Sequence, residues 1–133
     1  MVRVCCLAVC IGLLLSAVPV PAQSPGGAAP SAGIAYPSVA AAPAALRGKN
    51  GVKFSSNDGW VIANDTDGTI WSFTPSSHPA HPSVGQRKLV QQDGRFFVET
   101  RILCQAQKPA CDKLKGDYEL LDRRMNEAMR TGK

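Results

Sequence analysis

Two histidines and a pair of cysteines are the side chains in this 133-residue chain whose types and spacing could do chemistry. His78 and His81 are the only histidines, and the His-Pro-Ala-His spacing could place two imidazole nitrogens on one zinc or copper ion. Ligands at this spacing usually lie on a helix, whereas Pro75, Pro79 and Pro82 favour an irregular loop. We therefore expect an ordered proline-rich connection, with metal binding by His78 and His81 as the alternative.

Other residue patterns in the same part of the chain resemble active sites or ion sites only in part. Ser76 or Ser77 next to His78 could form a nucleophile–base pair, but no nucleophile elbow or oxyanion-type glycine motif accompanies them. A small hydrolase is therefore the third hypothesis for function, and no cofactor is expected. The segment 65–68, Asp-Thr-Asp-Gly, lacks the further ligands of a calcium loop and is interpreted as a hairpin turn.

The five cysteines divide into three near the start of the chain and a later pair, Cys104 and Cys111. Residues 1–22 read as a signal peptide, because Arg3 precedes an apolar run that ends before Pro19 and Pro21. An uncleaved anchor is the alternative. After cleavage only Cys104 and Cys111 remain, and an even pair in an exported chain predicts a disulfide. Two free thiols are the alternative. The sequence thus predicts a periplasmic or secreted protein.

The elements that must position these residues begin after a low-complexity stretch. Residues 23–48 are rich in alanine, proline, glycine and serine, with few large apolar side chains. This composition predicts a disordered linker, because little apolar area is available to offset the entropy of ordering. One folded domain is then expected over residues 49–133.

Short β-rich runs separated by turn signals follow, and they predict an antiparallel meander of four to five strands. The runs cover residues 52–55, 60–64, 69–74, 84–91 and 95–103. A two-residue turn at Asp93-Gly94 would place Leu89 opposite Val98 and Lys88 opposite Glu99. Phe96, Val98, Ile102 and Cys104 would then face the core.

A four-residue loop at 65–68 would place Trp60 and Ile62 on the same face as Trp71 and Phe73. That face is predicted to be core. A stacking platform for sugars or nucleic-acid bases, built from Trp60, Trp71 and Phe73, is the alternative.

A C-terminal amphipathic helix is predicted after Lys108-Pro109, because proline suits a first helical position. Its apolar residues recur at intervals of three and four, at Cys111, Leu114, Tyr118, Leu121, Met125 and Ala128. Gly116 and the small number of heptads favour packing on the sheet over a coiled coil. The fold class is therefore α+β: a small antiparallel sheet packed by one C-terminal helix.

The net charge of +5, which falls to +4 when Arg3 leaves with the signal peptide, favours weak attraction to anionic surfaces. No dense lysine or arginine run indicates a dedicated nucleic-acid site. The expected partner is an unknown protein or envelope component, the protein itself is expected to be a monomer, and membrane contact is expected only through the signal peptide during export.

Three motifs carry a resemblance to known proteins. They are segment 71–75 (Trp-Ser-Phe-Thr-Pro), segment 78–84 around the histidines, and Cys104 spaced by six residues from Cys111-Asp112-Lys113-Leu114. The Asp93-Gly94 hairpin accompanies them. Over about residues 50–125 the chain resembles a group of small exported proteobacterial proteins. The resemblance implies a periplasmic setting and transfers no catalytic residue. The functional hypothesis is a non-enzymatic binding or accessory module that acts through the open face of the sheet or through the loop at 75–83.

Overall fold

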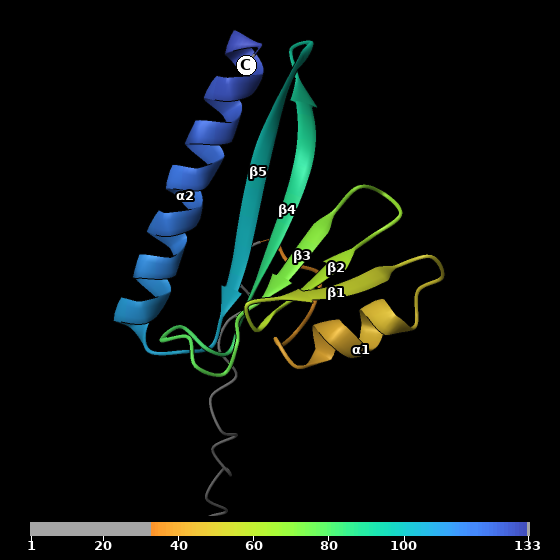
Figure 1. Ribbon diagram of the computed structural model, residues 1–133, viewed down its shortest axis with the longest axis vertical. Coiled ribbons are helices and arrows are strands. Elements are labelled where there is room, and N and C mark those ends of the chain that lie inside the picture. Colours follow the sequence, from red (N-terminus) through yellow and green to blue (C-terminus); the bar gives the residue numbers. More distant parts are fainter. Residues whose placement is uncertain (1–32, 133) are drawn as a thin grey trace, which may run out of the picture.

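The computed structural model describes residues 33–132, which form a five-stranded antiparallel sheet and two helices (Figure 1). The strands pair in sequence order. The elements are α1 (Ala41–Arg47), β1 (Lys53–Asn57), β2 (Trp60–Asn64), β3 (Ile70–Phe73), β4 (Ser83–Gln92), β5 (Arg95–Cys104) and α2 (Lys108–Thr131). The meander and its C-terminal helix confirm the predicted α+β fold. The predicted signal peptide, residues 1–22, lies outside the described residues, and neither described helix is long and apolar enough to cross a membrane.

Two of the hairpins are closed by Asp-Gly turns in which both residues have positive φ. The φ angles are 48° at Asp58 and 79° at Gly59, and 51° at Asp93 and 75° at Gly94. Positive φ at both central residues is typical of the type I′ turn, whose twist matches that of antiparallel strands. Aspartate tolerates this conformation and glycine adopts it freely, so the turn residues specify where β1 and β4 end.

The second of these turns sets the predicted register between β4 and β5. Leu89 lies opposite Val98 and Lys88 lies opposite Glu99, as the sequence predicted. Val98 is buried, but Phe96, which was also predicted to face the core, is 58% exposed. The reason is that β4 and β5 are longer than the other strands and extend beyond them (Figure 1).

The predicted register between β2 and β3 is wrong by one residue. The connecting loop has five residues, not four, so Asn64 pairs with Ile70 and not with Thr69. Within the loop the Asp65 N–H donates to the Thr69 carbonyl at 2.9 Å, and the Thr69 N–H donates to Asp67 Oδ1 at 2.9 Å. Both aspartates therefore shape the turn, in agreement with the hairpin interpretation of this segment.

This shift reverses the face on which one half of the expected aromatic cluster lies, because side chains alternate along a strand. Trp71 and Phe73 are buried on one face, where Trp71 pairs with Ala63 and Phe73 with Val61. Trp60 therefore points to the opposite face, and it is only partly buried there. The predicted single cluster of both tryptophans does not form.

The main core lies between α1 and the face of the sheet that carries Trp71. Its buried members are Ile34, Val39, Ala42, Leu46, Ala63, Trp71, Phe73, Val84 and Leu103. Tyr36 packs on Trp71 with ring centroids 5.1 Å apart. The core thus needs side chains that precede residue 49.

The prediction of a disordered linker is therefore wrong for residues 33–48. Four of the core residues, Ile34, Val39, Ala42 and Leu46, come from this segment, and Ala42 and Leu46 are fully buried. Pro43 does not prevent α1, because it lies in the first turn, where backbone N–H groups have no partner within the helix. Alanine-rich composition here reflects close packing of a short helix on the sheet. Residues 23–32 lie outside the described part.

The longer helix, α2, covers the opposite face. Val84 belongs to the core under α1, whereas the neighbouring Gly85 lies against Tyr118 of α2. Adjacent residues of a strand point to opposite faces, so the two helices sandwich the sheet. They are offset: α1 lies beneath β1 to β3, and α2 runs along β5 (Figure 1).

Cys104 and Cys111 form a disulfide between the end of β5 and the first turn of α2. The Cα atoms of Cys104 and Cys111 are 5.8 Å apart. Pro109 occupies the start of the helix, as predicted, and Gly132 ends it with φ of 66°. The disulfide therefore fixes α2 to the strand along which it packs.

An ion pair joins the segment after α1 to the loop between β2 and β3. Lys49 Nζ contacts Asp65 Oδ2, and the Asp65 side chain is only 2% exposed. The hydrogen bond from Lys49 lowers the pKa of the Asp65 carboxyl below its ordinary value of 3.8, and the Thr66 N–H acts in the same direction. The bond also raises the pKa of the Lys49 ammonium.

We expect this ion pair to make the free energy of unfolding depend on pH. A carboxyl whose pKa is lower in the folded state contributes stability above its unfolded pKa, and this contribution is lost as the pH falls through the folded pKa. The difference in free energy of unfolding between wild type and Asp65→Asn should thus be largest near neutral pH and shrink below about pH 4. Urea unfolding across a pH series measures it, and a difference that grew on acidification would contradict this account.

Candidate functional site

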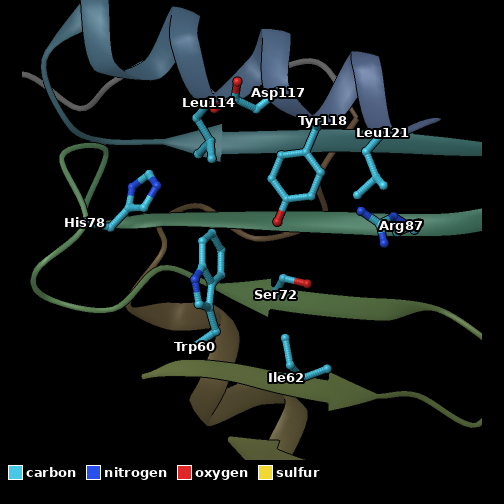
Figure 2. A pocket seen from close by; sticks show the side chains of 9 residues that line it. All are labelled: Trp60, Ile62, Ser72, His78, Arg87, Leu114, Asp117, Tyr118 and Leu121. Atoms are coloured by element: carbon cyan, nitrogen blue, oxygen red, sulfur yellow. The ribbon is translucent and has the colours of Figure 1, made fainter. Parts of the chain in front are cut away.

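A groove lies where α2 leaves the sheet uncovered, on the face opposite to α1. It has a volume of about 320 Å³ and is walled by α2 on one side and by β2 and the 74–82 loop on the other (Figure 2). Trp60 and Ile62 come from β2, and Leu114, Tyr118 and Leu121 come from α2. The walls are therefore largely apolar and aromatic, which is typical of binding sites for small ligands.

One wall of the groove is an aromatic pair. The rings of Trp60 and His78 meet edge to face with centroids 5.3 Å apart. His78 is held by its Nδ1, which accepts a hydrogen bond from the Ala80 N–H at 3.0 Å. The proline-rich loop is thus an ordered connection that presents an imidazole to the groove.

The opposite wall centres on Tyr118, whose side chain extends from α2 so that its phenol end reaches β4 at Gly85 (Figure 2). A Cβ atom built on Gly85 would be 3.1 Å from the Cζ and Oη atoms of Tyr118, so glycine at this position leaves room for the close approach of the phenol to the strand. Burial raises the pKa of the Tyr118 phenol, and the Ser72 hydroxyl and Arg87 only partly oppose this rise. The phenol is therefore protonated at neutral pH and offers a polar atom on the groove floor.

Arg87 of β4 contacts residues of α2 and β5. Its guanidinium carbon lies 5.4 Å from the Tyr118 ring centroid. Its Nε donates to Thr100 Oγ1 at 3.3 Å and lies 3.8 Å from Asp122 Oδ1. Thr100 in turn donates to Asp122 at 2.8 Å. This polar network joins α2 to β4 and β5 beside the groove.

We expect Gly85→Ala to disturb the helix–sheet contact. The added methyl group would lie 3.1 Å from the Cζ and Oη atoms of Tyr118, so the phenol must shift by a few tenths of an ångström, and overpacking of this kind costs about 1–3 kcal/mol of unfolding free energy. Urea unfolding gives the size of the loss. Gly116→Ala is the matched control, because nothing lies within 4 Å of that position and alanine favours the helix interior by about 1 kcal/mol. Equal stability of Gly85→Ala and wild type, with unchanged chemical shifts of the Tyr118 ring, would contradict the contact between Tyr118 and Gly85.

The two histidines line different surfaces. His78 faces the groove under α2, whereas His81 lines a hollow beside α1, and its Nδ1 lies 3.0 Å from the Thr74 carbonyl. Within residues 33–132 no group of three or more histidine, cysteine, aspartate or glutamate side chains could hold a metal ion. Metal binding through His78 and His81 stays a prediction. A zinc or copper titration tests it, and an affinity unchanged by replacing both histidines with alanine would exclude it.

The hydrolase hypothesis gains no geometric support from the serines. Ser76 and Ser77 are exposed, and the Nδ1 atoms of both histidines contact the backbone of Ala80 or Thr74 and not a serine hydroxyl.

No protein-family model, curated protein or solved structure matches this chain. The disulfide is compatible with an oxidising compartment outside the cytoplasm.

Sequence reasoning identified the loop at 75–83 but not the groove beside it. Tyr118 and Leu114 were assigned to the covered face of the helix, and the error in register placed Trp60 in the core. One signal could have found the site: a glycine inside a β-rich run, Gly85, indicates close approach of another group to the strand.

Proposed function

We propose that this protein is a non-enzymatic binding module of the periplasm or of the secreted fraction. The observation that supports the proposal is the groove between α2 and β2, which Trp60, His78 and Tyr118 line with aromatic rings. A concave, largely apolar surface with a few polar groups is typical of a site that binds a ligand.

The shape and polarity of the groove indicate the kind of ligand. A volume of about 320 Å³ is at the small end for ligand sites, so it suits one large apolar group. The charged side chains at its rim already have partners: Arg87 lies beside Asp122, and Asp117 pairs with Lys113 at 2.7 Å. An uncharged aromatic or aliphatic group, such as a side chain of a peptide or envelope component, therefore fits better than an ion.

The predicted signal peptide and the disulfide support the proposed compartment. The predicted signal peptide directs export, and Cys104 and Cys111 pair as expected in an oxidising environment. An envelope component is therefore the proposed partner.

Chemical-shift mapping tests the groove. We would titrate N-acetyl-tryptophanamide into the ¹⁵N-labelled exported protein, with N-acetyl-alaninamide as the small-side-chain comparison. The expected result is saturable shifts of the Trp60 indole N–H and of the Ser72 and Tyr118 amides with the first compound only.

A matched pair of variants makes the test specific. Trp60→Ala should abolish the shifts, because it removes one aromatic wall. Leu120→Ala changes an apolar residue of α2 that does not line the groove, and it should leave the shifts unchanged. Shifts scattered over the surface, or equally strong in Trp60→Ala, would rule out the groove as a binding site.

A further inference from the structure

A second apolar surface lies at the far end of the molecule and is separate from the groove. Leu89 and Phe96 of the β4–β5 hairpin are each 58% exposed, and Met129 of α2 is 42% exposed. They line one hollow of about 780 Å³. Figure 1 shows that the hairpin tip and the C-terminal end of α2 reach the same end of the molecule. We name the surface that Leu89, Phe96 and Met129 form the distal patch.

Two arginines flank the apolar side chains of the distal patch. Arg95 and Arg130 both line the hollow. Neither has a carboxylate within 4.0 Å in the part of the chain that the structure describes, whereas lysines 108, 113 and 115 of α2 each pair with an acidic residue one turn on. Asp93 in the hairpin turn and Glu127 on α2 are the nearby acidic residues in sequence. The hollow itself is lined by apolar groups, two cations and Asn126, with no carboxylate.

We propose that the distal patch docks on the surface of an anionic phospholipid bilayer. Phe96 and Leu89 enter the boundary between headgroups and acyl chains, and Arg95 and Arg130 contact lipid phosphates. Apolar side chains next to cations are what binding at an anionic membrane interface requires. The proposal is independent of the groove, and it goes beyond the sequence-based expectation that the protein meets a membrane only during export.

Two other occupants fit the patch less well. In a symmetric dimer Arg95 and Arg130 of both copies would be brought together, and like charges at an interface oppose association. An added peptide strand would need free backbone groups on β5. At the centre of that edge Asn126 occupies them: its Oδ1 accepts from the Val98 N–H at 2.6 Å, and its Nδ2 donates to the Val98 carbonyl at 3.1 Å.

Vesicle flotation tests the proposal on the protein purified as exported, with its N-terminus checked by mass spectrometry. We expect binding to vesicles that contain phosphatidylglycerol, little binding to pure phosphatidylcholine, and weaker binding at high salt. Arg95→Gln and Arg130→Gln should each weaken binding about fivefold. Phe96→Ser should weaken it at least as much, with circular dichroism to verify the fold.

Matched controls separate the patch from general charge and apolarity. Lys115→Gln removes the same single charge as either arginine variant but lies outside the patch, and Leu120→Ser changes a residue of α2 that is 41% exposed. Both should bind like wild type. Equal binding to both vesicle types, no binding, equal losses in the controls, or dimers that Phe96→Ser dissociates would each overturn the proposal. None of these outcomes bears on the groove, which the shift mapping tests separately.

Discussion

Leu46→Ala should lower the free energy of unfolding by about 2–5 kcal/mol, as large-to-small changes at fully buried positions do. Leu46 is 0% exposed although it lies in an alanine- and proline-rich stretch that composition alone marks as a linker. Its side chain joins Val39 and Ala42 in the core against Trp71. Urea denaturation followed by circular dichroism gives the loss.

Two comparisons make this result diagnostic. Ala45→Ser changes an exposed residue of the same helix and should stay within about 0.5 kcal/mol of wild type. A protein that begins at residue 49, the domain boundary predicted from the sequence, should lack cooperative unfolding, because Trp71 and Phe73 would lose their cover. If the shortened protein unfolded cooperatively with wild-type stability, α1 would not be part of the domain.

The second large effect concerns the disulfide. Replacing Cys104 and Cys111 by serine should cost about 2–3 kcal/mol, since the closed loop restricts the unfolded chain. The expected loss of local stability is largest in α2, because the disulfide holds the first turn of this helix to β5. Amide hydrogen exchange should therefore accelerate in α2 and at Val98, whose backbone bonds to Asn126 depend on the position of the helix.

Reduction provides the control for this prediction. Wild type in reductant should reach the stability of the double serine variant, and the variant should not respond to reductant. Labelling of both cysteines by a thiol reagent in the native exported protein would contradict the disulfide.

The parts of the fold that the sequence predicts are those set by local chemistry. Asp93-Gly94 specifies a two-residue turn, and this turn alone sets the pairing of β4 with β5. The apolar face of α2 is also set locally. The spacing of its apolar residues predicts which face packs on the sheet, and Pro109 predicts where the helix begins. Such features need no knowledge of distant residues.

The errors arose where distant residues decide. The loop at 65–69 gains a fifth residue through hydrogen bonds of Asp65 and Asp67, and this one residue moves Trp60 from the core to the groove. The segment 33–48 has too few large apolar side chains to fold alone, but the sheet has two apolar faces and α2 can cover only one. Val84 and Leu103 face away from α2, so a second element must cover them. The presence of apolar residues on both faces of the predicted sheet could have indicated that the segment before residue 49 is part of the fold.

Photocrosslinking in cells tests the groove most directly. A photoreactive amino acid at Asp117, at the rim of the groove, is compared with one at Lys115, which is similarly exposed but points to the other side of α2. We predict a specific adduct from position 117 that is absent from position 115 and is lost in Trp60→Ala. The same adducts from both positions, or none from position 117, would contradict the proposal that this groove binds a ligand.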